Sequence, residues 1–348
     1  MTKIALIEVG AMHDECLHSQ IQFLKYKNHK ITLFCHADLE PRIKDFPDLS
    51  KIIYLDLSSK IKKYYAWYKI RKYLIDNNFS KVIFNSAERN ILKLIYFLPT
   101  KIECIGTIHN ANKLIKKDYQ KKISKRLKKY LVLNDFIKDN VQKEKLTTNK
   151  IASYYPIFFP EIKRSLVKPK KEIWITIPGG FDFNKRDYTI LKKWKITKDI
   201  KIIFLGNYNN LKAIKFINNL KSHPSFSSFI FFDNYISNEL FHDYIMQSDF
   251  ILPLIHPNVP YYDLYLKYKI SGSYNLAFAY KIPLLIEQSF SEVMDFQENS
   301  IFYNYKNINN IFNLINKNSK EFYQHPKWEF EYQKEKYLSF VLDSQIQL

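Results

Sequence analysis

Glycine, cysteine and acidic side chains are all scarce in this chain of 348 residues. It contains six glycines and three cysteines, Cys16, Cys35 and Cys104. The cysteines show neither a pairing pattern nor the spacing of a metal site, which favours a reducing, cytoplasmic setting. The 34 aspartates and glutamates are outnumbered by 54 lysines and arginines, which gives a net charge of +20. This excess favours an anionic partner: nucleic acid, an anionic membrane surface or a phosphorylated substrate.

Long apolar runs and a leader pattern are also missing. The first ten residues, MTKIALIEVG, enter a strand pattern directly, and no apolar run approaches ~18 residues. We therefore expect a protein that is neither secreted nor membrane-spanning. Hydrophobic residues make up 46% of the chain, enough for sizeable cores, and the length indicates two domains.

Short apolar runs alternate with helical stretches in two series. Strands are predicted at 3–9, 31–35, 52–57, 82–85, 102–108 and 130–133, and again at 172–177, 201–205, 229–232, 250–255 and 283–286. Pro253 leaves the run at 250–255 a bent or edge strand at best. The predicted helices include 114–129, 188–194 and 328–342. Such alternation predicts α/β domains, each with a parallel, doubly wound sheet.

Prolines at 156, 160 and 169 interrupt the alternation between the two series. We therefore predict an N-terminal Rossmann-like domain at 1–155, a linker at 156–171, a C-terminal Rossmann-like domain at 172–327 and a final helix at 328–348. The two domains are expected to face each other across a cleft, and the final helix to pack back on the N-terminal domain.

Most of the few glycines follow predicted strands. Gly10, Gly106, the pair Gly179 and Gly180, and Gly206 all do so. Ligands of open α/β sheets bind at the carboxyl ends of the strands, so these turns are candidate binding positions. The alternative is that glycine ends strands for conformational reasons alone.

The sixth glycine lies in Ser271-Gly272-Ser273, which opens a predicted helix that Lys281 closes. A helix start offers unpaired backbone N–H groups and the positive end of the helix dipole, which together suit a phosphate. Lys267 and Lys269 precede the turn and add positive charge. A capped helix with two surface lysines is the alternative interpretation.

Four stretches carry a resemblance to a known family. They are VGAMHDECLHSQIQFLKYKNHKITLF at 9–34, TIHN at 107–110, IPGGFDFNKRDY at 177–188 and YKISGSYNLAFAYKIPLL at 268–285. With the two-domain pattern, they resemble GT-B glycosyltransferases of the bacterial surface-glycan type, distantly the family-four enzymes. The resemblance implies sugar transfer from a nucleotide-diphosphate sugar to a glycan or lipid-linked acceptor during synthesis of a cell-surface polysaccharide such as lipopolysaccharide.

Sugar transfer releases a diphosphate, whose charge needs stabilisation by a metal or by basic groups and backbone N–H groups. No Asp-x-Asp triplet is present. We therefore predict a metal-independent, cofactor-free donor site in which the glycines let the backbone approach the ligand. The predicted donor-binding residues are Gly179, Gly180, Lys185, Arg186, Lys269, Ser271, Gly272, Ser273 and, against the ribose, Glu287.

Three residues of the first domain are candidate catalytic groups. His109 follows a predicted strand at the place where, by the resemblance, a histidine contacts the donor sugar. His13 and Glu15 lie in the first loop and could act as a general base on an acceptor hydroxyl, whereas Asp14 is expected to cap a helix.

The chain departs from family-four retaining enzymes at two positions. Those enzymes carry two glutamates eight positions apart, where this chain has Tyr268 and Leu276. The stereochemistry of transfer therefore does not follow from the resemblance.

Two basic stretches, 60–74 and 113–133, lie in the first half, and the first interleaves lysines with tyrosines and a tryptophan. This pattern predicts peripheral binding to the anionic inner face of the cell membrane, and we expect no nucleic-acid partner. Two alternatives remain open. One is a non-catalytic basic protein, acting on nucleic acid or as a degenerate partner subunit. The other is a sugar-nucleotide epimerase of the same fold.

Overall fold

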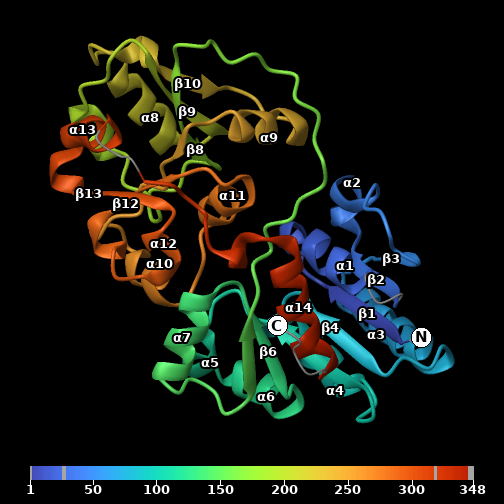
Figure 1. Cartoon of the computed structure of the whole chain (residues 1–348). Coiled ribbons are helices and arrows are strands. Elements are labelled where there is room, and N and C mark those ends of the chain that lie inside the picture. The colour runs from blue at the N-terminus through green and yellow to red at the C-terminus, as the bar shows by residue number, and fades with distance from the viewer. Residues whose placement is uncertain (1, 26–28, 317–319, 344–348) are drawn as a thin grey trace. The chain divides into compact units, whose positions relative to one another are not determined.

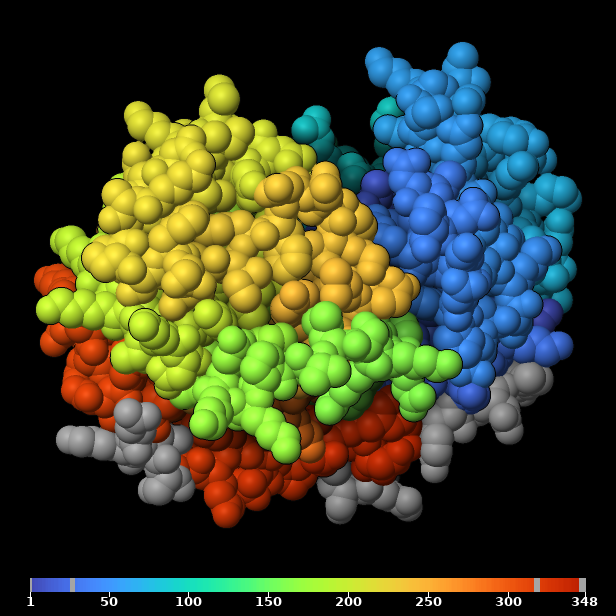
Figure 2. All heavy atoms as spheres, turned by 90° about the horizontal axis from the view of Figure 1, so that it is seen from above, coloured from blue at the N-terminus to red at the C-terminus, as the bar shows by residue number. Residues whose placement is uncertain are grey.

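The computed structural model describes residues 2–25, 29–316 and 320–343, which form two compact units (Figure 1). Unit 1 comprises residues 1–160 and 329–348, and unit 2 comprises residues 161–328. The chain between the last strand of the first series and the first strand of the second contains no helix or strand, and residues 161–168 run over the surface of unit 2 (green in Figure 2). This segment is fixed to unit 2 by Asp243, whose Oδ2 accepts the backbone N–H groups of Ser165 and Leu166.

Unit 1 is built on a parallel sheet in which seven strands fall in the described part of the chain, in the order β3-β2-β1-β4-β5-β6-β7. The strands are β1 (Lys3–Glu8), β2 (Lys30–His36), β3 (Lys51–Leu55), β4 (Lys81–Phe84), β5 (Glu103–Thr107), β6 (Lys129–Val132) and β7 (Lys150–Ser153). The strand order reverses between β1 and β4, which is the position where open α/β sheets bind ligands.

The helices of unit 1 are α1 (Leu17–Lys25), α2 (Glu40–Ile43), α3 (Lys60–Asp76), α4 (Leu92–Phe97), α5 (Lys113–Lys116), α6 (Asp118–Arg126), α7 (Asp135–Lys143) and α14 (Phe330–Leu342). The final helix, α14, packs against α1 and β7, as the sequence predicted. Its Tyr337 is fully buried, and its ring lies 5.4 Å from that of Phe23 and 5.1 Å from that of Tyr154.

Unit 2 has a second parallel sheet, ordered β10-β9-β8-β11-β12-β13 over the residues described. Its strands are β8 (Ile173–Pro178), β9 (Ile200–Asn207), β10 (Phe229–Phe232), β11 (Phe250–Ile251), β12 (Leu284–Glu287) and β13 (Ser300–Tyr303). Its helices are α8 (Leu211–Leu220), α9 (Asn238–Met246), α10 (Tyr262–Lys267), α11 (Gly272–Tyr280), α12 (Met294–Gln297) and α13 (Ile311–Asn316). The order reverses between β8 and β11, so both sheets are doubly wound, as predicted.

Three predicted elements differ in the structure. The helix predicted at 114–129 is two helices, α5 and α6, because Lys117 between them is extended, and Lys129 belongs to β6. The helix predicted at 188–194 is a short 3-10 helix, Thr189–Lys193, which ends where the extended Trp194 enters the core and stacks on Phe312.

The strand predicted at 250–255 pairs only through β11, Phe250–Ile251. Pro253 lacks the N–H that a ladder needs, and Leu254 turns the backbone with a φ of 57°. The early end of β11 leaves the following loop free to approach the end of β8, where the Asp187 N–H donates to the carbonyl oxygen of Leu254.

Candidate functional site

The start of α11 lies beside a group of cations in unit 2. Ser271 caps the helix, its Oγ accepting the Ser273 N–H at 3.4 Å. Gly272 is exposed with open space around its Cα, and its N–H has no hydrogen-bond partner among the described residues. The sequence therefore correctly predicted an accessible helix start at 271–273, and Lys281 ends the helix in the left-handed conformation with a φ of 53°.

Arg186 joins the end of β8 to this helix start. It is 3% exposed, and its guanidinium donates to the carbonyl oxygens of Pro178, Gly179 and Gly180 and to Ser273 Oγ, the last at 3.2 Å. Its Nε has no hydrogen-bond partner among the residues described. Much of its hydrogen-bonding capacity thus holds the loop in place, while its charge remains next to the start of α11.

The close packing at the end of β8 requires glycine. Gly179 has a φ of 90°, a conformation that L side chains rarely adopt. A Cβ on Gly206, at the end of β9, would lie 2.5 Å from the carbonyl group of Gly179. Gly180 is exposed and has no atom within 4 Å of the position of a Cβ, so the backbone is open to a ligand there.

Lys185 supplies the most perturbed charge of the group. Its Nζ lies 5.2 Å from the centre of the Tyr265 ring, and Lys269 Nζ lies 5.6 Å from the same centre. Burial, together with the positive charges of Arg186 and Lys269, lowers the pKa of Lys185 to about 7. Within the described residues no carboxylate forms an ion pair with Lys185, and cations held this close together are typical of a site that receives an anion.

A buried network fixes the loop that carries Lys185 and Arg186. Asp187 accepts from Asn258 Nδ2 at 2.8 Å and lies 3.3 Å from His256 Nδ1. His256 Nε2 lies 2.6 Å from the hydroxyl of Tyr303, at the end of β13. Burial raises the pKa of Asp187, but hydrogen bonds from His256, Thr189 and Asn258 outweigh it and leave the pKa well below its usual range. No local sequence pattern marks this network, because its members come from three distant segments.

Glu287, the predicted ribose contact, ends β12 and is 5% exposed. Its carboxylate caps the 3-10 helix Gln288–Phe290 by accepting hydrogen bonds from the N–H and hydroxyl of Ser289. It thus lies at the carboxyl edge of the second sheet, with one oxygen already occupied.

In unit 1, the predicted catalytic residues meet where the strand order reverses. The rings of His13 and His109 stack with centroids 3.8 Å apart and planes inclined by 14°. His109 Nε2 lies 2.7 Å from the carbonyl oxygen of Asn85, and His13 Nδ1 lies 3.1 Å from Glu15 Oε1. The sequence therefore identified three residues that the fold brings together, although they are about 95 residues apart in the chain.

The first loop differs from expectation at Asp14. The residue before the first helical turn is His13, in the left-handed conformation with a φ of 69°, so Asp14 is not the helix cap. Asp14 instead pairs with Arg42 at 2.7 Å. The unusual backbone of His13 places its ring over His109.

Glu8 is a member of this cluster that the sequence analysis missed. It is fully buried at the end of β1 and accepts hydrogen bonds from Gly10 N–H at 2.6 Å, Asn85 Nδ2 at 2.7 Å and Ser86 Oγ at 2.5 Å. Burial raises the pKa of Glu8 to about 7 despite these hydrogen bonds. The sequence carried one sign of this residue's importance, a glutamate at the end of the mostly apolar strand KIALIE. A carboxylate that a strand buries needs hydrogen-bond partners or a functional role.

The charges within the cluster are coupled. Burial lowers the pKa of His13, but the carboxylates of Glu15, Glu8 and Glu88 outweigh it, so the net shift is upward. Burial raises the pKa of Glu15. The hydrogen bond from His13 and the charge of His109 lower it by more, so the net shift is downward. With Glu8 titrating near neutral pH, the cluster can both accept and donate a proton, as general acid–base catalysis requires.

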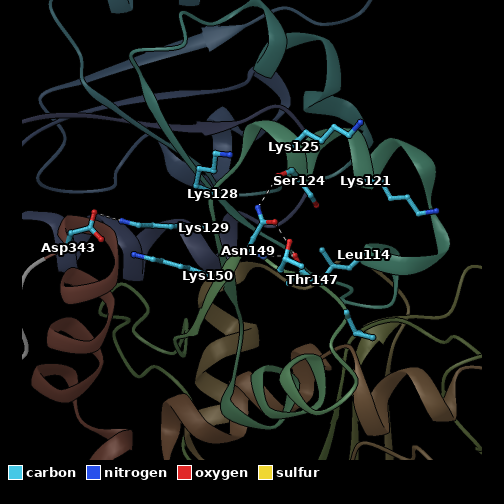
Figure 3. A pocket seen from close by; sticks show the side chains of 12 residues that line it. Leu114, Lys121, Ser124, Lys125, Lys128, Lys129, Thr147, Asn149, Lys150 and Asp343 are labelled. Carbon is cyan, nitrogen blue, oxygen red and sulfur yellow. Dashed lines mark hydrogen bonds and ion pairs between the residues drawn. The ribbon is translucent and has the colours of Figure 1, made fainter.

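A cavity of about 750 Å³ lies at the opposite end of the unit 1 strands (Figure 3). Lys129 and Lys150 begin β6 and β7 and extend toward Asp343 after α14, whereas Lys121 and Lys125 project from α6 away from this group. Lys129 is 4% exposed and pairs with Asp343 at 2.7 Å and Glu103 at 2.9 Å. Part of this basic surface is therefore structural.

Among the residues that the structure describes, no group of three or more histidine, cysteine, aspartate or glutamate side chains could hold a metal ion. Within the same residues, no helix is both long and apolar enough to cross a membrane.

Comparison with known proteins identifies the fold. No protein-family model matches the sequence, and no curated protein matches it. The structure is similar to UDP-GlcNAc 2-epimerase from Methanocaldococcus jannaschii, with a TM-score of 0.64 and 11% identity over 99% of this chain and 100% of that chain. It is similar to the lipopolysaccharide outer core galactosyltransferase WaaB, with a TM-score of 0.60 and 12% identity over 98% and 99%. HepE from Anabaena, solved with UDP-glucose, gives a TM-score of 0.63 and 8% identity over 98% and 95%. The chain therefore has the GT-B fold, which nucleotide-sugar glycosyltransferases share with UDP-GlcNAc 2-epimerases.

Proposed function

We propose that the protein is a glycosyltransferase that moves a sugar from a nucleotide-diphosphate sugar to a glycan or lipid-linked acceptor of a bacterial cell-surface polysaccharide. The observation that carries this proposal is the group of Lys185, Arg186 and Lys269 beside the open start of α11. Cations and free N–H groups at this position would bind the diphosphate and stabilise its charge as it leaves. Two proteins of the same fold, HepE with UDP-glucose and WaaB, are consistent with such a donor.

We assign roles to the residues that lie at the carboxyl ends of the strands in each of the two sheets. Unit 2 would hold the nucleotide diphosphate at Gly179, Gly180, Lys185 and the start of α11. Unit 1 would supply proton transfer, with His13 and Glu15 nearest to solvent and Glu8 buried behind them. His109 would contact the donor sugar.

A second candidate function is sugar-nucleotide epimerisation. The observation that favours it is the acid–base cluster of Glu8, His13 and His109, because an epimerase must add and remove protons at the sugar. UDP-GlcNAc 2-epimerase from Methanocaldococcus jannaschii also has this fold.

One experiment separates the two functions. Thermal-shift screening with nucleoside diphosphates and their sugars identifies the donor, because a ligand that binds only the native state raises the melting temperature. The donor is then incubated with and without a mixture of glycan acceptors, and the products are resolved by chromatography. A transferase releases nucleoside diphosphate when acceptor is present. An epimerase instead produces an isomeric nucleotide sugar without acceptor. A basic binding protein would give neither product.

We expect the transfer to be independent of a divalent metal, because the basic side chains and backbone N–H groups of the proposed donor site would neutralise the leaving group without one. Activity measured with excess chelator should equal activity in untreated buffer. Complete loss in chelator, with recovery on adding manganese or magnesium, would overturn this mechanism.

We further propose that the protein binds the inner face of the cell membrane peripherally through unit 1. Helix α3 exposes Tyr64, Tyr65 and Tyr68, each more than half accessible, and Tyr96 and Phe97 on α4 are also exposed. Lysines interleave with these rings: Lys93 Nζ donates to the Tyr64 hydroxyl at 2.7 Å, and Lys69 Nζ lies 4.6 Å from the centre of the Tyr65 ring. Exposed aromatic rings with cations suit the interface of an anionic bilayer.

A further inference from the structure

A small pocket of about 210 Å³ opens at the carboxyl edge of the unit 1 sheet. It lies over the ends of β1, β2 and β3, and it is lined by Val9, Gly10, Ala11, His36, Leu57, Lys63, Trp67 and Asn90. Pockets for drug-sized ligands are usually ~300–1,000 Å³, so this one suits a single ring and no longer chain. Neither the donor site nor the acid–base cluster described above uses its side chains.

The pocket shares one loop with the acid–base cluster. Gly10 lines the pocket, and its N–H donates to Glu8 Oε1 at 2.6 Å. Three residues later in the same loop, His13 stacks on His109. A ring held in the pocket would therefore lie beside the groups that can remove a proton from one of its hydroxyls.

The pocket lining combines an aromatic ring with polar groups that make no hydrogen bond to the described residues. Trp67 is 6% exposed, and its indole N–H makes no hydrogen bond to any described residue. Asn90 is exposed, and its side-chain amide likewise has no hydrogen-bond partner within the described ranges. An indole can pack against the C–H face of a sugar ring while amide and N–H groups bind its hydroxyls.

The charge of the lining indicates what kind of ring it takes. It contains Lys63 and His36 and no aspartate or glutamate. Lys63 Nζ has no ion pair in the part of the chain that the structure describes, in contrast to the preceding Lys62, which pairs with Asp56 at 2.6 Å. An unpaired ammonium in a pocket without a carboxylate favours a ligand that brings its own negative charge.

We propose that this pocket is the acceptor subsite, and that it takes a single sugar ring bearing an anionic group, a carboxylate or a phosphate. The inference rests on the proposed transferase function, because it assigns the acceptor to a place beside the proton-transfer cluster. Lys63 binds the anionic group, Trp67 packs on the ring, and Asn90 binds a hydroxyl.

Saturation-transfer NMR titrations test the subsite with three probes: glucose, glucuronate and glucose 6-phosphate. We expect the wild-type protein to bind at least one anionic sugar about tenfold or more tightly than glucose, since a charged hydrogen bond contributes ~1.5–3 kcal/mol. The two anionic probes distinguish a carboxylate from a phosphate. Lys63→Gln should reduce the anionic preference to the level of glucose, and Trp67→Leu should weaken all binding.

Lys62→Gln is the matched control, because it removes the same charge from the adjacent residue outside the pocket. Equal binding of glucose and both anionic sugars, equal losses in the Lys63 and Lys62 variants, or no binding of any probe would each overturn the subsite. Thermal shifts with UDP on the same samples report separately on the donor site. A UDP shift without sugar binding rejects the subsite alone, whereas sugar binding without any nucleotide shift rejects the transferase function and leaves an anionic sugar-binding pocket.

Discussion

At the scale of single residues, Lys185 is the group whose protonation state a bound anion would change most. Its pKa is lowered to about 7 by burial and by the neighbouring charges of Arg186 and Lys269. A bound diphosphate stabilises the protonated form, so the free protein must take up a proton when it binds above pH 7. Arg186 is less useful as a probe, because it also ties together the carbonyl groups at the end of β8 and Ser273.

We therefore predict that affinity for a nucleoside diphosphate falls between pH 7 and pH 9 in the wild-type protein. Lys185→Gln should weaken binding by about tenfold or more at pH 7 and remove most of this pH dependence. Isothermal titration calorimetry in buffers of different ionisation enthalpy measures both the affinity and the proton uptake. Lys198→Gln, an exposed lysine of the same unit, should behave like wild type. An unchanged pH dependence in Lys185→Gln would remove this residue from the donor site.

A second prediction at this scale concerns how Glu8 makes the stability of the fold depend on pH. Its pKa is raised from 4.5 to about 7 in the folded protein, so the folded state binds the proton more tightly than the unfolded chain does. Stability contributed by the protonated carboxyl is fully present below pH 4.5 and is lost as the pH rises to 7. The linked loss is about 3 kcal/mol. Thermal unfolding of Glu8→Gln should lack this decline between pH 5 and pH 8, and identical slopes for variant and wild type would contradict it.

At the scale of elements, a chain of buried hydrogen bonds joins α14 to the acid–base cluster. The Tyr337 hydroxyl donates to Gln20 Oε1 at 3.0 Å, and Gln20 Nε2 donates to Asn85 Oδ1 at 2.6 Å. Asn85 Nδ2 then donates to Glu8 Oε2 at 2.7 Å and to the carbonyl oxygen of His13 at 2.8 Å. The last helix of unit 1 thus supports residues at the end of its first and fourth strands.

Tyr337→Phe should lower the free energy of unfolding by about 1–3 kcal/mol, because it leaves the buried oxygen of Gln20 without a donor. Urea denaturation measures the change. Tyr68→Phe is the control, since the Tyr68 ring is exposed and its hydroxyl makes no hydrogen bond to the described residues. Equal stability of the Tyr337 and Tyr68 variants would show that α14 is held by packing alone.

The sequence predicted the elements whose signals are local. The serine cap and exposed glycine of α11 and the closing Lys281 are short-range features, and the structure has all three. It predicted the short β11 poorly, because the apolar run at 250–255 continues into a loop that is buried by tertiary contacts rather than by strand pairing. The partnership of Asp187, His256 and Tyr303 was beyond a sequence argument, since it depends on which strand ends become neighbours in the sheet.

The same limit applied to the acid–base cluster. His13 and His109 were individually recognisable because each lies at the end of a predicted strand or in the first loop. Their stacking depends on the left-handed backbone conformation of His13, and no residue pattern in the sequence predicted that conformation. Glu8 was hidden because a strand periodicity counts it as one polar residue in an apolar run.

At the scale of the whole molecule, the large positive charge is not all available to a partner. Lys81 and Lys129 are buried at the starts of β4 and β6, the two strands that flank β5, and they share the carboxylate of Glu103 at the start of β5. Arg126, within the basic stretch at 113–133, donates to the carbonyl oxygens of Pro99 and Ile102. Exposed lysines of α6 remain for a membrane, namely Lys121, Lys122 and Lys125.

We predict that the wild-type protein floats with anionic vesicles at low salt and is released as salt rises, because exposed charges are screened over ~8 Å at physiological ionic strength. Changing Lys121, Lys122 and Lys125 together to Glu should abolish flotation and leave nucleotide binding unchanged. The matched control changes Lys212, Lys215 and Lys221 of unit 2 to Glu, with the same loss of charge. If wild type ignores anionic vesicles at low salt, or if both triple variants are released alike, unit 1 carries no specific membrane surface.

The division of the chain gives unit 1 two segments, residues 1–160 and 329–348, with all of unit 2 between them. During synthesis on a ribosome, the seven strands of the first sheet emerge long before the tyrosine that completes their buried hydrogen bonds. Unit 2 is finished first, although its sequence starts second. Until α14 has been synthesised, the surface of α1 and β7 that it covers is exposed. A nascent chain in that state exposes apolar surface of the kind that chaperones bind. The buried hydrogen bonds behind β1 are therefore complete only once α14 has been made.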